Sequence, residues 1–366
     1  MRKKTLIIVS VSTLAVLWWV SFNLAVFCGF YALGKVVKSG ERVVFVRRSN
    51  LESEPGVRVL DANNRYFQVT RMDPNRIDVR WKGTEIYLKE PKCRLKKLDS
   101  NLVHVTARLN DRQYPLLIDS GLSPALVVND MVVIDNKLEI FPFETEEPTI
   151  AGCCHLDKIE IGDLTISTPV CLYTLNHYET RKLGRTQWKE REIILGLDLL
   201  CKFRYFLVDN IHSEVEFSIR ESFQPDNIEM WQCYNMSVET TAKNAKAIII
   251  RIPIAGEMTE ARLDTGTSWG LAMTENAWGE YSTKFQILKE SRERARFFYG
   301  WKDVRKITVS EFSIGDKSMT DASILILDDS VFKESFILIG MDYFKNTVVV
   351  IDFEHNLLWV RKPQPL

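Results

Sequence analysis

The sequence has no surplus of charge of either sign. Its 48 lysines and arginines are balanced by 48 aspartates and glutamates, so the formal net charge at pH 7 is zero. Proteins that bind nucleic acid generally present a surplus of basic side chains to the phosphate backbone. The composition therefore gives no indication of a nucleic-acid partner.

Histidine is scarce, and cysteine does not occur in the spacing that metal sites need. Five histidines are scattered over 366 residues, and no serine or cysteine lies in a recognisable nucleophile motif. The seven cysteines lack the paired short spacing of zinc ligands, and Cys153-Cys154-His155 is too contracted to present tetrahedral ligands easily. We therefore expect no metal and no other cofactor, and interpret most cysteines as buried small apolar residues. Disulfides are an open alternative if the protein folds outside the cytoplasm.

One long apolar run is present, and it stands at the amino terminus. It extends from Leu6 to Leu33 behind the basic start MRKKT. This length exceeds the roughly 20 residues that cross a bilayer, so we expect residues 1–34 to form a short cytoplasmic tip and a single transmembrane anchor. A cleaved signal peptide is the alternative. The basic start favours an amino end inside the cell, with the rest of the chain outside the cytoplasm.

Two aspartates stand at the ends of strand-like apolar runs and lead into hydroxyl-rich turns. Asp264 lies in ARLDTGTSWG, and Asp119 lies in PLLIDSGLSPALVV. Either aspartate alone could be a turn residue, since Asp and Gly are common loop formers. Two carboxylates that face each other, in contrast, can perform acid–base hydrolysis.

The chain repeats itself around these two aspartates. The runs LVHVTARL and AIIIRIPI each end ten residues before the acid, and IEIGDLTI resembles FSIGDKSM further along. IILGLDLL then matches ILIGMDYF, with Gly196 lying 77 residues after Asp119 and Gly340 lying 76 residues after Asp264. Offsets that agree this closely indicate an internal repeat. Four later aspartates also recur in both halves, and we interpret them as structural acids of turns and strand ends: Asp198, Asp209, Asp342 and Asp352.

Local patterns predict a hairpin before each acid and a short helix after it. The turn-like pairs Asn110-Asp111 and Ala255-Gly256 separate each upstream run from the run that carries the aspartate. Asn129 and Thr274 stand where each could cap a short helix. We therefore expect each half to present its aspartate from a β-hairpin.

The motif of apolar residues, Asp, Thr or Ser, and Gly, followed much later by apolar residues and a Gly, resembles the aspartic peptidases, both pepsin-like and retroviral. DTGTS is the more specific of the two motifs, and the resemblance covers about residues 99–363. It implies an all-β-dominated fold of two pseudo-symmetric, retropepsin-like lobes with short helices, preceded by the transmembrane helix. The two lobes would span residues 99–222 and 247–366, and residues 223–246, which break the strand pattern, would connect them.

The segment of residues 35–98 has alternating runs such as RVVFVRR and EIYLKE, and these predict several short strands. We interpret it as a β-rich juxtamembrane segment, either a spacer or an extra sheet on the first lobe. A role in binding a substrate or partner is the alternative.

By the same resemblance, Asp119 and Asp264 would be the catalytic pair. Two carboxylates in contact hold one proton between them, because both cannot ionise cheaply. The pair would then activate a water molecule for attack on a peptide carbonyl.

Five residues beside the acids would support them: Ser120, Gly121, Thr265, Gly266 and Thr267. The hydroxyls of Ser120 and Thr265 would bond across the interface between the lobes. The hydroxyl of Thr267 would donate to the Asp264 carboxylate, whereas Leu122 cannot do the same for Asp119. We therefore expect the shared proton to lie mainly on Asp119.

In this family β-hairpin flaps close over an extended substrate. The candidate flap tips are Ala151-Gly152-Cys153 in the first lobe and Tyr299-Gly300-Trp301 in the second.

Together, these expectations predict a membrane-tethered aspartic endopeptidase that acts on an extended peptide or protein substrate. The alternative is a catalytically inactive peptide-binding or structural module with the same fold. The two acids favour the enzyme, because a binding module has no reason to bury a carboxylate pair. No feature of the sequence indicates an oligomeric state.

Overall fold

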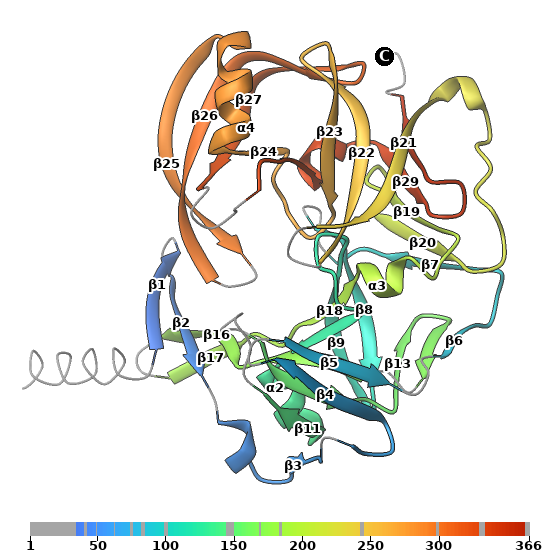
Figure 1. The fold of residues 1–366 in the computed structure, drawn as a ribbon, viewed down its shortest axis with the longest axis vertical. Helices are drawn as coiled ribbons and strands as arrows, with labels where there is room; N and C mark the ends of the chain where they lie inside the picture. Colours follow the sequence, from blue (N-terminus) through green and yellow to red (C-terminus); the bar gives the residue numbers. More distant parts are fainter. Residues whose placement is uncertain are drawn as a thin grey trace, which may run out of the picture.

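The protein is dominated by β-strands, which form two large sheets accompanied by a few short helices (Figure 1). The computed structural model describes residues 34–362, apart from 40–41, 49, 62, 74–75, 82–84, 99–101, 144–149, 168–169, 183–184, 242–244, 298–299 and 329–333. The first half of the repeat is defined here as residues 92–218, and the second half as residues 231–361.

The first large sheet has 11 strands and belongs mainly to the first half. Its strands, in spatial order, are β3 (Arg58–Val59), β11 (Glu139–Pro142), β12 (Ile150–His155), β15 (Val170–Thr174), β10 (Leu126–Asn129), β18 (Ile193–Gly196), β9 (Arg112–Asp119), β8 (His104–Leu109), β13 (Lys158–Ile161), β14 (Leu164–Ser167) and β6 (Glu85–Leu88).

The second large sheet has 13 strands and contains the second half together with strands from the first. Its strands, in spatial order, are β25 (Ile287–Phe297), β26 (Gly300–Ile314), β27 (Lys317–Leu327), β24 (Leu271–Thr274), β28 (Ile337–Gly340), β23 (Glu257–Asp264), β22 (Lys246–Ile254), β21 (Trp231–Thr240), β30 (Leu357–Arg361), β29 (Val348–Asp352), β19 (Tyr205–Asp209), β20 (Glu214–Ser218) and β7 (Lys92–Lys96).

Two smaller sheets and seven short helices complete the described part of the chain. The small sheets are formed by β1 (Gly34–Ser39), β2 (Arg42–Arg48), β16 (Asn176–Lys182) and β17 (Arg185–Lys189), and by β4 (Phe67–Asp73) and β5 (Arg76–Trp81). The helices are η1 (Leu51–Ser53), α2 (Asp130–Asn136), α3 (Leu197–Leu200), η2 (Ile228–Met230), α4 (Glu275–Tyr281), η3 (Ser282–Lys284) and η4 (Met341–Phe344).

The elements around the two aspartates match between the halves. β8–β9 and β22–β23 are antiparallel hairpins that end at the acids, and Asn110 and Ala255 have positive φ in their turns. The predicted caps are also present, because the side chain of Asn129 accepts a hydrogen bond at the start of α2 and that of Thr274 does so at the start of α4. The local patterns of the sequence therefore predicted these hairpins and helices correctly.

Each acid-bearing strand lies beside a short strand that is buried along most or all of its length. β18 runs parallel to β9 and pairs Gly196 with Asp119, and β28 runs parallel to β23 and pairs Gly340 with Asp264. Every residue of β18 is buried. Continuous burial explains why the runs IILG and ILIG are apolar without alternation.

The two halves are joined by direct strand pairing. β19 of the first half pairs with β29 of the second, with Tyr205 opposite Asp352 and Asp209 opposite Val348. On the two sides of this pair, β20 of the first half pairs with β7, and β30 of the second half pairs with β21. One large buried cluster also includes residues of both halves, such as Ile118 and Leu263. The halves therefore share a sheet and a core.

The predicted β-rich segment of residues 35–98 does contain strands, but they are distributed over several sheets. β3 and β6 lie at the two ends of the 11-stranded sheet, and β7 lies at one end of the 13-stranded sheet. β1 and β2 instead belong to a small sheet with β16 and β17, in which β2 pairs with β16, and β4 pairs with β5. The segment thus extends the sheets of both halves.

The connecting segment of residues 223–246 was expected to break the strand pattern, and this expectation is wrong for its centre. β21 is a ten-residue strand that pairs with β22 on one side and β30 on the other. Only Trp231 and Met236 are buried in it. Its sequence therefore lacks the apolar alternation that would have revealed it, and tertiary pairing determines its conformation.

The transmembrane anchor predicted for residues 1–34 lies outside the described residues, except that Gly34 begins β1. Within the part of the chain that is described, no helix has the length and apolar character needed to cross a bilayer.

Four of the six cysteines in the described region are buried, in agreement with their interpretation as small apolar residues. Cys154 on β12 and Cys171 on β15 are register partners, and their sulfur atoms lie 3.1 Å apart.

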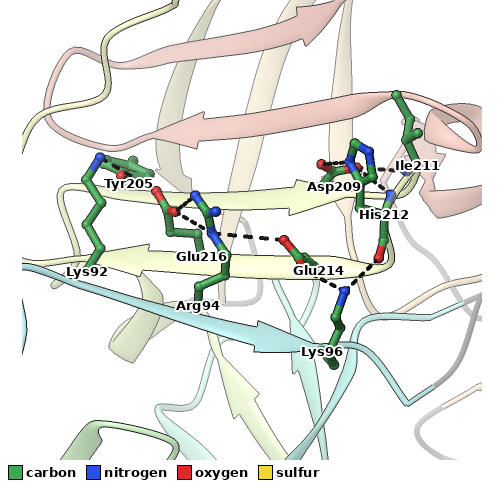
Figure 2. A network of polar contacts seen from close by, with 9 residues as sticks. All are labelled: Lys92, Arg94, Lys96, Tyr205, Asp209, Ile211, His212, Glu214 and Glu216. Atoms are coloured by element: carbon green, nitrogen blue, oxygen red, sulfur yellow. Dashed lines mark hydrogen bonds and ion pairs between the residues drawn. The ribbon is translucent and has the colours of Figure 1, made fainter.

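A network of polar side chains covers one face of the sheet that joins the halves, on β7, β20 and β19 (Figure 2). Glu216 is its most buried carboxylate at 4% exposure. It accepts hydrogen bonds from the Tyr205 hydroxyl at 2.6 Å and from Nε of Arg94 at 3.0 Å. Glu214 lies two residues away, is more exposed, and pairs with Lys96 at 2.6 Å.

We expect Glu216→Ala to lower the free energy of unfolding by about 1–3 kcal/mol, because it leaves the buried Tyr205 hydroxyl without its acceptor. Glu214→Ala is the matched control, and we expect a clearly smaller loss, since its ion pair with Lys96 is exposed to solvent. Urea unfolding of both variants measures the difference. Equal losses would show that the buried network does not anchor β7.

Candidate active site

The two aspartates end neighbouring hairpins and meet where the halves touch. Their carboxyl groups lie close enough together that each acid affects the pKa of the other. Within each turn, Oδ1 of the aspartate accepts a hydrogen bond from the backbone N–H two residues later: Gly121 to Asp119 and Gly266 to Asp264, both at 2.8 Å. The turns therefore fix one oxygen of each carboxyl group.

Glycine is required on both sides because each turn packs against the opposite carboxyl group. A Cβ atom on Gly121 would lie well inside contact distance of the Asp264 carboxyl carbon, and a Cβ atom on Gly266 would clash equally with that of Asp119. No other residue leaves this space free. The small residue after each hydroxyl residue thus permits the close approach of the two acids.

The hydroxyl residues between acid and glycine cross from one half to the other. The backbone N–H of Ser120 donates to Oγ1 of Thr265 at 2.9 Å, and the backbone N–H of Thr265 donates to Oγ of Ser120 at 3.0 Å. Each hydroxyl then donates to a backbone carbonyl of the opposite half, Ser120 to Leu263 and Thr265 to Ile118. Both residues are fully buried. This symmetric set of four bonds locks the turns together.

Both aspartates are half-buried, and their pKa values are raised from the ordinary value. For Asp119 the main causes are burial and the negative charge of Asp264, and the pKa rises far. Burial also raises the pKa of Asp264, but backbone N–H groups of Gly266 and Thr267 and the hydrogen bond from Asp119 oppose the rise. These effects favour the shared proton on Asp119 and the ionised form on Asp264.

The donor that favours ionised Asp264 differs from the predicted one. We expected the Thr267 hydroxyl, but its backbone N–H makes the bond, and its Oγ1 accepts from the Trp269 N–H at 3.4 Å. In the first half, the N–H of Leu122 donates to the backbone carbonyl of Asp119. The asymmetry between the acids thus comes from the backbone conformation of the two turns.

A cavity of ≈ 280 Å³ opens beside Asp119, between the halves. The first half contributes Leu102, His104, Leu117, Asp119, Val127, Val128, Asn129, Thr174, Glu190, Glu192 and Ile194. The second half contributes Gly266, Thr267, Ser268, Trp269 and Phe297. Asp119 of one half and the turn residues Gly266 and Thr267 of the other therefore line a cavity that could receive part of a ligand.

The candidate flap tip of the first half is placed differently from the prediction. Gly152 and Cys153 are buried inside β12, where they pair with β11 on one side and β15 on the other. The connection between β11 and β12 falls at residues 143–149, of which 144–149 are outside the described residues. A glycine in a strand interior misled the prediction, because glycine at a bulge and glycine at a hairpin tip give the same local signal.

In the second half, the candidate flap is a long hairpin formed by β25 and β26. Gly300 begins β26 and pairs with Phe297 at the end of β25, and Tyr299 lies outside the described residues. Phe297 also lines the cavity beside Asp119. The end of this hairpin therefore reaches the candidate site.

Sequence reasoning missed all the aromatic residues of the cavity and its ionisable residues other than Asp119: His104, Glu190, Glu192, Trp269 and Phe297. Only the alternation of basic and acidic residues in KERE, directly before β18, offered a signal for Glu190 and Glu192. The others belong to segments whose proximity depends on how the halves pack.

No family model matches this chain, and no curated protein sequence is significantly similar to it. Among the described residues, no group of three or more His, Cys, Asp or Glu side chains is arranged to hold a metal ion. The chemistry of the site therefore has to be argued from its own groups. A carboxylic acid in contact with a carboxylate can give one proton and take another in the same step.

We expect Gly266→Ala to destabilise the protein by about 1–3 kcal/mol, because the added methyl group overlaps the Asp119 carboxyl group. Gly279→Ala is the matched control, since a Cβ atom at this position of α4 meets nothing within 4 Å. Alanine in a helix should leave stability unchanged or raise it by up to about 1 kcal/mol. Thermal unfolding compares the two, and a Gly266→Ala variant as stable as the wild type would contradict the close packing.

We expect Asp119→Asn to be more stable than the wild type at neutral pH. The folded protein holds the Asp119 proton more tightly than the unfolded chain does, so the aspartate costs stability that grows as pH rises above its ordinary pKa of about 4. Asparagine removes this cost. The melting temperatures of the wild type and Asp119→Asn should therefore agree at pH 3, and that of Asp119→Asn should be higher at pH 7.

Asp209→Asn is the control, and we expect it to change stability at pH 7 in the opposite direction. Burial opposes ionisation there, but hydrogen bonds from His212 and Ile211 hold the pKa of Asp209 below its ordinary value. Its ionised form contributes stability above pH 4 that is lost on acidification, so Asp209→Asn should be less stable at pH 7. An Asp119→Asn variant that also loses stability at pH 7 would refute the raised pKa.

Proposed function

We propose that the protein is a membrane-tethered aspartic endopeptidase whose two halves form retropepsin-like lobes. One observation carries the proposal: carboxyl groups from equivalent turns lie together, each packed against the glycine of the opposite turn, beside a cavity between the halves. Burying two acids together costs free energy, and a protein that only binds or supports other molecules gains nothing from that cost.

In the proposed reaction, ionised Asp264 is the base and protonated Asp119 is the acid. Asp264 takes a proton from a water molecule between the carboxyl groups, and the water oxygen attacks the peptide carbonyl carbon. Asp119 gives its proton to the carbonyl oxygen, so no full negative charge develops there. The product of this step is a tetrahedral diol, with the proton now on Asp264.

The second step breaks the peptide bond and restores the pair. Asp264 gives its proton to the amide nitrogen, the carbon–nitrogen bond breaks, and one hydroxyl of the diol returns a proton to Asp119. The products are a carboxylic acid and an amine. The rigid bonds between Ser120 and Thr265 support this cycle, because they hold the two acids at fixed separation while protons move.

The arrangement of the cavity supports a peptide substrate that lies between the halves. The β25–β26 hairpin contributes Phe297 to the same cavity that contains Asp119. A hairpin beside the acids can add its edge to an extended substrate, which would give the substrate backbone hydrogen-bond partners.

The membrane tether in this proposal rests on the apolar run between Leu6 and Leu33 and on the basic residues before it. By the charge of that start, the lobes would lie outside the cytoplasm.

We expect Asp119→Asn and Asp264→Asn each to reduce peptide cleavage by at least about 10³-fold, because the acids act as one unit. The full chain would be incubated with a mixed peptide library from pH 3 to pH 7, and product peptides would be identified by mass spectrometry. A statine-type mimic of the tetrahedral diol should inhibit the wild type.

Circular dichroism of each purified variant provides the control for folding. Glu260→Gln, which changes an exposed acid on β23, should keep wild-type activity. Cleavage that persists in either folded Asn variant would refute the mechanism, and a wild type that cleaves no peptide would leave the inactive binding module as the function.

A further inference from the structure

The segment before β18 directs two acids into the cavity and its one arginine away from it. In Glu190-Arg191-Glu192, both glutamates line the cavity beside Asp119. Arg191 instead forms an ion pair with Asp135 of α2. Side chains two apart on an extended segment share a face, so this alternation concentrates negative charge on the cavity side.

Asn129 holds this segment in place. Its backbone N–H donates to the carbonyl of Glu192 at 3.2 Å, and its side-chain amide donates to the carbonyl of Glu190 at 3.1 Å. The amide oxygen of Asn129 caps α2 at the same time. Glu190 is only 8% exposed. The two glutamates are therefore presented from a rigid, hydrogen-bonded support.

The charged groups of the cavity are mostly acidic. Among the described residues that line it, Asp119, Glu190 and Glu192 carry carboxyl groups, and none is a lysine or arginine. His104 is the basic residue of this lining, with Nε2 3.8 Å from the carboxylate of Glu192. The negative charge of Glu192 also contributes to the raised pKa of Asp119, which places it within electrostatic reach of the acids.

Apolar side chains from both halves form part of the remaining walls. Leu117, Val127 and Ile194 form a buried cluster on the side of the first half. Trp269 and Phe297 cover the side of the second half, with their rings edge to face and their centroids 5.1 Å apart. The walls of the cavity thus present both apolar side chains and carboxylates.

We infer that this cavity is a substrate subsite for an arginine or lysine side chain close to the bond that is cleaved. Such a side chain has an apolar stem, which the leucine, valine, isoleucine and aromatic walls can cover, and a cationic end, which Glu190 and Glu192 can bind. The aromatic faces of Trp269 and Phe297 would also favour a cation. The cleavage part of this inference rests on the proposed function, whereas the binding part does not.

The first experiment measures selectivity with the full chain. Synthetic peptides that differ at one position would carry arginine, lysine, citrulline, norleucine or glutamate beside the cleaved bond. We expect kcat/KM for arginine and lysine peptides to exceed that for citrulline and norleucine peptides by about tenfold or more, because the cation is bound by buried carboxylates. Glutamate peptides should be the poorest substrates.

Variants assign the preference to the two glutamates. In Glu190→Gln/Glu192→Gln, the ratio of kcat/KM for arginine over citrulline should fall towards one. Glu260→Gln removes one acid far from the cavity, and we expect it to keep the wild-type ratio. If both variants lose the preference equally, it comes from overall charge and the subsite is refuted.

A binding experiment separates failure of the subsite from failure of the proposed function. Asp264→Asn keeps every described residue that lines the cavity, so fluorescein-labelled arginine and citrulline peptides can be compared on it by fluorescence anisotropy. At least tenfold tighter binding of the arginine peptide supports the subsite, even if the wild type cleaves nothing and the proposed function fails. Equal binding of the two peptides overturns the subsite, and so does cleavage by the wild type without preference for arginine or lysine.

Discussion

The close approach of two strand ends is the constraint on which the rest of the structure depends. Ser120 and Thr265 exchange hydrogen bonds between backbone and side chain, and Gly121 and Gly266 leave room for the carboxyl group of the other half. Because these groups are buried, each bond that is lost would leave a polar group without a partner. The hairpins, the parallel strands beside them and the joint sheet all hold these two turns at contact.

Within this symmetric frame, small differences in backbone give the two acids different surroundings. Asp264 receives an additional hydrogen bond from the Thr267 N–H, while the equivalent N–H of Leu122 bonds to a backbone carbonyl. The cavity is also asymmetric, because it lies beside Asp119. Its carboxylates belong to the first half, and its aromatic rings belong to the second. The proposed acid and base thus follow from local departures from symmetry.

The sequence predicted the parts of the site that depend on local pattern. The hairpins, the caps at Asn129 and Thr274 and the proximity of the two aspartates follow from a repeat with matched offsets. β21 was missed because it is mostly exposed and takes its conformation from its neighbours. Gly152 was misplaced because a glycine signal does not distinguish a strand interior from a tip. The cavity depends on how distant segments pack, so no single stretch of sequence contains it.

The pairing of β19 with β29 places strands of both halves in one continuous sheet within a single chain. A site assembled from two separate subunits forms only above the concentration at which they associate, and identical subunits must carry the same side chains on both sides. A covalently joined pair is free of both conditions. It stays assembled at any dilution, and each half can acquire its own side chains, as the glutamates of one half and the aromatic residues of the other illustrate.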